Sequence, residues 1–346
     1  MIESYSGRKT RLPVIKNVIT QGVKLKTFAQ VLEETDGEHR HLLLGNGFSQ
    51  AWRHDIFNYK NLLDSANFGA RDAAIKAIFQ KLETYDFEAV MQSMTVSADI
   101  CELYGGDAAL LEAIREDADI LKSSLVTAIA QTHPSLPSAV TDAQYEMARN
   151  FLSQFGSVFT LNYDLLMYWA RNKVELDPDN YVTDDGFRRN RTWVGSETDQ
   201  NIFFLHGGLH LYDELGVIKK HAYTQDGETI IDQVRANLAL NRFPIFVSEP
   251  THFQKLDKIL HNPYLNYCYG KLGKMNGNLV IYGHSMDETD THIFEQADMS
   301  NIENVYISIF GDPNSRQNRR TKANAESYFA SCNVHFYSAE STPIWS

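Results

Sequence analysis

Short apolar runs that alternate with segments of helical period are the feature of this sequence that most constrains its fold. Seven runs are candidates for buried strands, at residues 41–44, 157–161, 202–205, 244–247, 278–282, 305–310 and 334–337. Runs that are apolar throughout are typical of strands covered on both faces, and a helical segment follows most of them. The pattern predicts an α/β fold, a Rossmann-like and mostly parallel sheet with helices on both faces.

A long helical stretch separates the first two expected strands. Helical period continues through residues 70–83, 87–103, 108–132 and 143–155. A simple crossover between parallel strands needs only about a dozen residues, so we expect residues 62–155 to form an inserted helical subdomain. Residues 41–61 and 156–346 then make up the sheet domain, and residues 1–40 an N-terminal arm and helix.

Two shorter segments interrupt the second part of the sheet domain. Residues 176–198 mix Asp, Asn, Gly and Arg, which favours a loop or a small hairpin. A second hairpin is expected around residues 213–220. The first of these segments should lie over the edge of the sheet.

Charge and cysteine content exclude several classes of function. The formal net charge of −12 disfavours direct nucleic-acid binding, since the basic residues form no concentrated patch. No apolar stretch approaches the roughly 20 residues needed to cross a bilayer, so no membrane association is expected. The three widely spaced cysteines offer neither a disulfide framework nor a zinc motif. We therefore expect a cytoplasmic protein, with the basic N-terminal residues as a solvated arm.

A glycine-rich turn follows the first expected strand. It comprises Gly45, Asn46, Gly47, Phe48 and Ser49. Glycines let the backbone approach a ligand closely, and exposed amides before a helix favour a phosphate. The same residues also suit a strand that merely has to turn tightly, so phosphate binding and a plain turn remain two interpretations.

Polar side chains end the next two strands. Asn162 and Asp164 follow the second strand, and His206, Gly207 and His210 follow the third. In an open α/β sheet this edge holds the ligand crevice. Asp164 can instead cap the helix that follows it.

For the histidine three interpretations stand. His206 suits an acid or a base because its ordinary pKa is near neutral. It can also simply bond a backbone carbonyl. Metal binding by His206 and His210 is disfavoured because the intervening glycines argue against a helix that would hold both ligands.

A fourth motif ends the strand at 278–282 and comprises Gly283, His284 and Ser285. Gly283 and Ser285 could meet a phosphate or a ribose. Asp287 is a weaker candidate, because the acidic residues here can serve to cap the helix at 291–297.

Together the four motifs resemble those of the sirtuin superfamily. Gly45-Asn46-Gly47-Phe48-Ser49 is similar to the sirtuin G-A-G-x-S turn, Thr160-Leu161-Asn162-Tyr163-Asp164 to T-Q-N-x-D, His206-Gly207 to H-G, and Gly283-His284-Ser285 to G-[ST]-S. Protein deacylases of the superfamily carry a four-cysteine zinc module that this sequence lacks. The chain resembles instead the bacterial sirtuin-like NAD hydrolases, many of which act in antiphage defence.

The resemblance implies a NAD⁺ hydrolase that releases nicotinamide, leaves ADP-ribose or a cyclic form of it, and needs no metal. It implies that Asn162 and His206 are the catalytic pair, and that residues of the four motifs bind NAD. Rival functions are a sensor that binds NAD or ADP-ribose without turnover, an ADP-ribosyltransferase and a deacylase. Because unregulated NAD loss would harm the host, we also expect control by homo-oligomerisation or by a regulatory protein partner.

Overall fold

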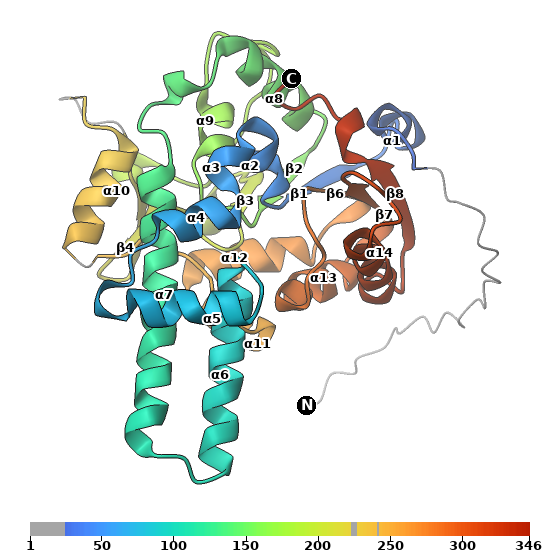
Figure 1. Cartoon of the computed structure of the whole chain (residues 1–346). Helices are drawn as coiled ribbons and strands as arrows, with labels where there is room; N and C mark the ends of the chain where they lie inside the picture. Colours follow the sequence, from blue (N-terminus) through green and yellow to red (C-terminus); the bar gives the residue numbers. More distant parts are fainter. Residues whose placement is uncertain (1–24, 223–226, 241) are drawn as a thin grey trace, which may run out of the picture.

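The computed structural model describes residues 25–222, 227–240 and 242–346. Within that part of the chain a six-stranded sheet, parallel throughout, forms the centre of the molecule (Figure 1). Its strands are β1 (Arg40–Leu44), β2 (Ser157–Thr160), β3 (Ile202–Phe204), β6 (Asn276–Tyr282), β7 (Asn301–Ile309) and β8 (Asn333–Ser338). The fold is α/β and Rossmann-like, as the sequence predicts. Most of the N-terminal arm expected from the sequence lies outside the described residues.

The order of the strands locates the crevice. The sheet runs β3-β2-β1-β6-β7-β8, so the chain builds outward from β1 to one edge and then returns to β6 on the other side of β1. This is the strand order of dinucleotide-binding folds, in which ligands bind beyond the carboxyl ends of the strands where the order reverses. The reversal lies between β1 and β6.

The prediction of one strand is wrong. Residues 244–247 do not join the sheet, and their one bridge is antiparallel, between Phe246 and Gly207. The segment packs against the loop after β3, where Ile245 N–H donates to Leu211 O (2.8 Å) and Val247 N–H donates to His206 O (2.9 Å). A short apolar run has the same sequence pattern in a strand and in a buried loop, and here the loop supports the backbone of His206.

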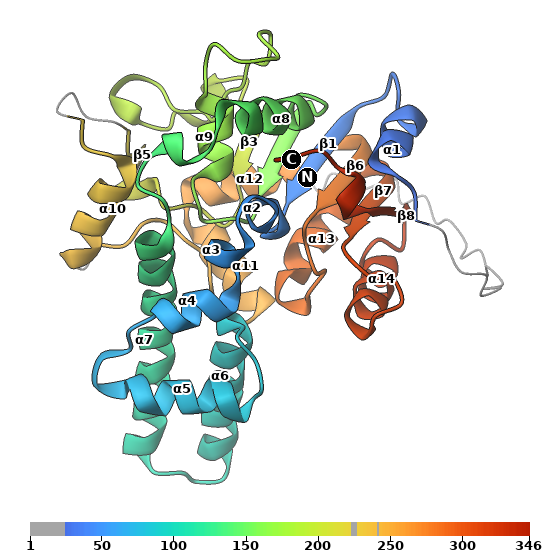
Figure 2. The same ribbon diagram turned by 45° about the horizontal axis from the view of Figure 1, so that its top comes forward.

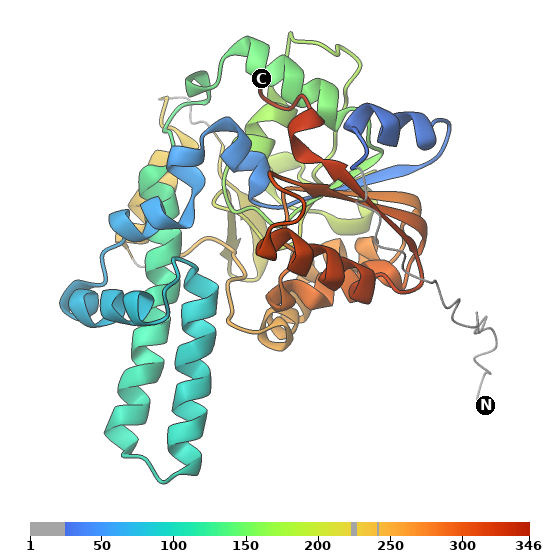
Figure 3. The ribbon, with the colours of Figure 1, turned by 45° about the vertical axis from the view of Figure 1, so that its right-hand side comes forward.

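Helices cover both faces of the sheet (Figure 3). On one face Phe28 of α1 and Phe151 of α8 have ring centroids 5.3 Å apart, and Phe151 lies 5.8 Å from Tyr282 of β6. Helices α12, α13 and α14 lie on the other face. The described α-helices outside residues 59–132 are α1 (Phe28–Glu34), α2 (Gly47–Trp52), α3 (His54–Phe57), α8 (Asp142–Leu152), α9 (Leu166–Asn172), α10 (Ile230–Ala239), α11 (His252–His261), α12 (Pro263–Leu272), α13 (Thr291–Asp298) and α14 (Arg316–Tyr328). Of these, α10 packs on the helix Ala108–Thr132 and not on the sheet.

A second helical unit projects from the sheet, and we call α4 to α7 the helical arm. It comprises α4 (Tyr59–Ser65), α5 (Asp72–Lys81), α6 (Phe87–Leu103) and α7 (Ala108–Thr132). The long helices α6 and α7 form an antiparallel hairpin, with α5 lying across it (Figure 2). Helix α8, although continuous with this stretch in sequence, packs on the sheet instead.

Local sequence explains the hairpin's boundaries, which the sequence predicts to the residue. Asp86 and Asp107 cap α6 and α7, each accepting two backbone N–H groups through its side chain. Helix α6 ends at Leu103, and the N–H groups of Gly105 and Gly106 beyond it donate to Glu102 O and Cys101 O in a Schellman arrangement. Gly105 has a φ of +71°, which glycine adopts without strain.

The expected small hairpin is confirmed as β4 (Leu211–Glu214) and β5 (Val217–Lys220), which pair antiparallel. Residues 176–198 form a loop with short 3₁₀ turns and two bridges, one between Phe187 and Trp193 and one from Thr192 to Lys219 of the neighbouring hairpin. The three cysteines are free thiols. Among the described helices, none combines the length and the apolar composition required to cross a membrane.

Candidate functional site

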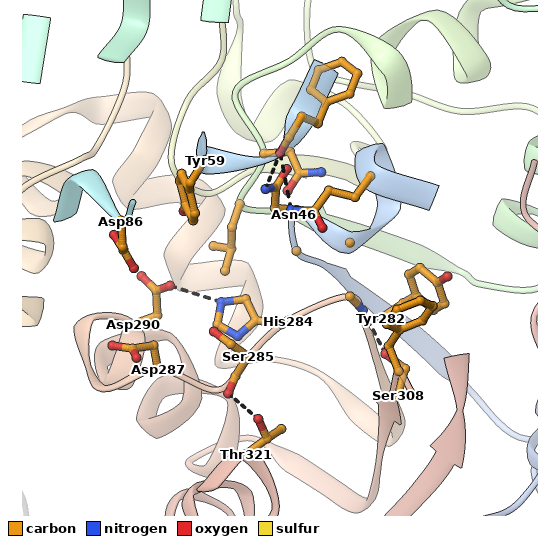
Figure 4. Close-up of a pocket in the computed structure, with 18 of the residues that line it drawn as sticks. Asn46, Tyr59, Asp86, Tyr282, His284, Ser285, Asp287, Asp290, Ser308 and Thr321 are labelled. Atoms are coloured by element: carbon orange, nitrogen blue, oxygen red, sulfur yellow. Dashed lines mark hydrogen bonds and ion pairs between the residues drawn. The ribbon is translucent and has the colours of Figure 1, made fainter. Parts of the chain in front are cut away.

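A cavity of about 740 Å³ opens at the carboxyl ends of the central strands (Figure 4). Its walls come from the turns after β1, β2, β3 and β6, from the start of α14, and from α4, α6 and α7 of the helical arm. This volume falls within the roughly 300–1,000 Å³ of small-molecule sites. The cavity lies where the strand order reverses, so the fold and the hollow indicate the same ligand site.

The turns after β1 and β6 pack backbone against backbone, and this explains their glycines. A Cβ on Gly45 would lie 2.6 Å from Gly283 O, and a Cβ on Gly283 would lie 2.6 Å from the Cα of Gly47. Gly45 N–H donates to Tyr282 O (2.9 Å) and Gly47 N–H to Gly283 O (2.8 Å). The two motifs therefore form one interlocked unit. Both amides are already bonded, so neither is available to a phosphate.

A buried chain of hydrogen bonds fixes the side chain of Asn162. Its Nδ2 donates to Ser49 Oγ (3.1 Å), and Ser49 Oγ donates to Asp164 Oδ2 (2.5 Å). Because the Ser49 hydroxyl gives its proton to a carboxylate, it must accept from the amide nitrogen of Asn162. The amide oxygen of Asn162 is left to accept a hydrogen bond from another group.

The carboxylate of Asp164 caps helix α9 and also orients the hydroxyl of Ser49. Its Oδ1 accepts from Leu166 N–H (2.8 Å) at the start of α9, while Oδ2 accepts from Ser49. The carboxylate also lines the cavity. Burial raises the pKa of Asp164, against the bonds from Ser49 and Leu166 that favour its charged form.

His206 lies directly beyond β3 and is 2 % exposed. Burial lowers its pKa well below the ordinary value, outweighing the attraction of Asp290, so the imidazole is neutral. Its Nε2 lies 3.7 Å from Asp290 Oδ1 and has no hydrogen-bond partner in the described part of the chain. A neutral imidazole at the cavity wall has the protonation state required of a base.

Nine of the twelve residues proposed from the sequence line the cavity, and three do not. Those on the wall are Gly45, Asn46, Gly47, Asn162, Asp164, His206, Gly283, His284 and Ser285. Ser49 lies behind the wall and holds Asn162. The ring of Phe48 packs on Trp345 with centroids 5.0 Å apart, and Gly207, with φ +78°, fits against Ile245 where a Cβ would clash.

A buried ionic cluster beside His206 was missed by the sequence analysis. Lys255 of α11 is fully buried, and its Nζ lies 2.8 Å from Asp290 Oδ1 and 2.5 Å from Glu88 Oε2 of α6. Asp290 ends the 3₁₀ turn η5 (Glu288–Asp290) and also accepts from His284 Nε2 at 3.1 Å. The sequence predicts that the acidic residues at 287–290 cap the helix at 291–297, but Asp287 caps η5 by accepting Thr289 N–H, and no described side chain caps α13.

The two carboxylates of the cluster, Asp290 and Glu88, differ in how readily they ionise. Burial opposes ionisation of Asp290, but the ammonium of Lys255 outweighs it and holds the pKa of Asp290 well below the usual range. Burial raises the pKa of Glu88 to about 7, although Lys255 lies beside it. One buried cation thus serves two carboxylates, and Glu88 is the one that protonates first as the pH falls.

His206, Asp290 and His292 place one potential metal-ligand atom each within 4.8 Å of one another. The carboxylate oxygen nearest His206 is the one that Lys255 already contacts. The ammonium therefore supplies the positive charge that an ion would bring, and these residues are not assigned as metal ligands.

Comparison with known proteins gives a family. A family model described as a domain of unknown function (DUF4917) matches residues 42–345. The matched range includes the whole sheet except its first residues, the helical arm and every residue that lines the cavity. No curated protein matches the chain. Because the match covers far more than half of its length, the protein belongs to the DUF4917 family.

Proposed function

We propose that this protein is a NAD⁺ glycohydrolase that cleaves the bond between nicotinamide and ribose. One observation carries the proposal: Asn162 and His206, at the ends of the neighbouring strands β2 and β3, line the same cavity at the point where the strand order reverses. Dinucleotides bind at this point in folds with this strand order. The resemblance of the four motifs to sirtuin-like hydrolases supplies the choice of NAD.

The reaction suits the groups on the wall. The bond between C1′ and the pyridinium nitrogen breaks, its electron pair stays on nicotinamide, and a bond forms between C1′ and the oxygen of water. The proton lost by water goes to the neutral imidazole of His206 and then to solvent. The amide oxygen of Asn162, with its nitrogen held by Ser49, accepts a hydrogen bond from the ribose or the water.

The charge distribution supports a cationic group near His206. Asp86, Glu88 and Asp290 line that side of the cavity, and Figure 4 labels Asp86 and Asp290 there. Carboxylates stabilise both the pyridinium ring of NAD⁺ and the positive charge that develops on the ribose as the bond breaks. No metal is needed for this step, because the leaving group departs as a neutral molecule.

The phosphates of NAD require a different wall. Gly45 and Gly47 have no free amide, so we place the pyrophosphate near Arg320 and the first turn of α14, where Ser315 and Gln317 also line the cavity. Arg320 is mostly exposed and lies 3.7 Å from Asp287. Its guanidinium is therefore free enough to turn toward an anion.

Incubation of the purified chain with NAD⁺, followed by chromatography, tests the proposal. We expect nicotinamide together with linear or cyclic ADP-ribose. Asn162→Ala and His206→Ala should each abolish release while leaving the melting temperature near that of the native chain. Asn150→Ala and the exposed His261→Ala are matched controls that should keep full activity.

The rival functions give different products. Intact NAD with a raised melting temperature indicates a sensor. Label from NAD on protein indicates a transferase, and NAD consumption that needs an acylated peptide indicates a deacylase. The proposal includes control of the activity by homo-oligomerisation or by a partner protein, and a role as a NAD-depleting effector in antiphage defence. Expression in bacterial cells, with NAD measured before and after phage infection, tests that role.

A further inference from the structure

A carboxylate lies behind the imidazole of His206. Asp290 Oδ1 is 3.7 Å from His206 Nε2, a nitrogen that is buried and without a hydrogen bond to any described residue. As the nearest acceptor, the carboxylate favours the tautomer in which Nε2 carries the hydrogen. Nδ1 is then the basic nitrogen of the ring, and a proton taken there gives an imidazolium whose Nε2–H faces a negative charge.

Asp290 is itself held in place from two sides, and Figure 4 shows one of them, its bond with His284. His284 Nε2 donates to its Oδ2 at 3.1 Å. The tautomer of His284 is fixed, because its Nδ1 accepts Met286 N–H at 2.9 Å, which leaves the hydrogen on Nε2. The buried ammonium of Lys255 contacts Oδ1 at 2.8 Å. Held in this way, the carboxylate keeps its position when the charge on His206 changes.

The helical arm adds one more group. Glu88, in the first turn of α6, contacts the same ammonium at 2.5 Å and accepts from Thr289 Oγ1 at 3.4 Å. When Glu88 is charged it takes a share of Lys255, and the net charge that His206 meets becomes more negative. When Glu88 is neutral or withdrawn, Lys255 neutralises Asp290 more fully. The arm is thus joined electrostatically to the side chain proposed as the base.

We propose that Asp290 is the positioning residue of His206, and that Glu88 of the helical arm strengthens its action through the lysine that the two carboxylates share. The inference rests on the proposed function for its effect on catalysis. Asp290 orients the imidazole and stabilises its protonated form. The arm contributes to the reaction without contacting the ribose, and its docking against the sheet domain becomes a condition for full activity.

Other ionisable groups also face His206. The ring of His292, on α13, lies nearly parallel to it with centroids 5.7 Å apart. Lys255, His284 and His292 all oppose a positive charge on His206, and Asp290 favours it. Among these groups Asp290 is therefore the one whose removal takes a stabilising charge away from the imidazolium of His206. As the acceptor nearest Nε2, it is also the one that biases the tautomer.

The test uses the full chain labelled with ¹⁵N-histidine at pH 8, where Glu88 is charged. The ¹⁵N shifts of His206, assigned by its loss in His206→Gln, report the tautomer without any need for turnover. We expect mainly the Nε2–H form in the native chain and a mixed or Nδ1–H form in Asp290→Asn. Glu88→Gln should move the ratio in the same direction by a smaller amount.

The rate of nicotinamide release is the second measurement. Asp290→Asn should lower kcat for nicotinamide release about 10- to 100-fold, since it weakens the base and also removes one of the carboxylates that face the pyridinium ring. Glu88→Gln should lower kcat less, with a loss that disappears below pH 7. Glu249→Gln is the matched control: it removes another carboxylate that joins the arm to the body, through Lys122, but lies outside the cavity, and should change neither reading.

The outcomes separate the two proposals. If Asp290→Asn does not fold, Glu88→Gln carries the test alone. An unchanged tautomer in every folded variant overturns the inference, as does a loss of activity in Glu249→Gln equal to that in Glu88→Gln. If the tautomer shifts in these variants but the native chain leaves NAD intact, the positioning of His206 is supported and hydrolysis is rejected.

Discussion

The side-chain amide of Asn162 donates to the hydroxyl of Ser49 at 3.1 Å, and this bond decides which end of the amide is left for a ligand. Ser49 is fully buried and does not line the cavity. Its hydroxyl is committed to Asp164, so the nitrogen of Asn162 faces Ser49. A residue of the glycine-rich motif thereby acts on the proposed site without contacting NAD.

Removal of that hydroxyl should leave Asn162 in place but let its amide turn over. We expect Ser49→Ala to lower kcat for nicotinamide release about 10- to 100-fold, because a misplaced group loses much of its effect. Loss of the two hydrogen bonds should also cost about 1–3 kcal/mol of stability. Ser97→Ala, on the exposed side of α6, is the matched control. Native kcat in Ser49→Ala would show that the orientation of the amide does not matter.

Because the turns after β1 and β6 are interlocked, adding one methyl group there should strongly reduce stability. A Cβ on Gly47 would overlap the backbone of Gly283, so Gly47→Ala should lower the free energy of unfolding by about 1–3 kcal/mol. Gly270, in α12, has open space where a Cβ would lie, and Gly270→Ala should instead raise it by up to about 1 kcal/mol. Denaturant melts of both variants measure this. Equal stability of the two would contradict the close packing of the turns.

Because Lys255 is buried, its substitution should lower the free energy of unfolding far more than substitution of a surface lysine. Lys255→Met leaves Glu88 and Asp290 without their shared cation, and we expect a loss of about 3–5 kcal/mol. Lys122, partly exposed on α7, pairs with Glu249, which also has Lys258. Lys122→Met should cost less than about 1 kcal/mol. The two free energies of unfolding, measured at pH 8, test the difference, and similar losses would argue against the cluster.

Glu88 should give stability a specific dependence on pH. Its pKa is about 7 in the folded chain and near 4.5 when unfolded, so folding takes up a proton between these values. The contribution of Glu88 to stability is complete below pH 4.5 and is lost as the pH rises through 7. The stability of the native chain relative to Glu88→Gln should therefore fall across this window. A constant difference from pH 4.5 to 8 would contradict the raised pKa.

Sequence reasoning predicts the parts of this fold that repeat a local pattern. Six of the seven expected strands are the six strands of the sheet, since each is a run of buried apolar residues with a turn at its end. The bounds of helices α6 and α7 are predicted to the residue from helical period, and the structure shows that Asp86 and Asp107 cap their starts. The run at 244–247 fails because pairing, and not composition, separates a strand from a buried loop.

Some residues of the candidate site can likewise be predicted from the sequence, and others cannot. Asn162 and His206 are recognisable because each follows a strand, and parallel strands bring their ends together. Lys255 and Glu88 are not recognisable, because each lies in an ordinary amphipathic helix and only tertiary packing places them beside Asp290. The glycines of the two turns are recognisable as special, but their reason, contact with one another, depends on the β1–β6 pairing.

Nicotinamide release from NAD⁺ by the purified chain tests the central claim most directly. The native chain should release nicotinamide in amounts equal to the NAD consumed, under the conditions or with the partner that activates it, and Asn162→Ala and His206→Ala should release none while remaining folded. Equal release by the native chain and both variants would contradict the assignment of these residues. Tight binding of NAD with no nicotinamide formed under any of these conditions would contradict hydrolysis itself.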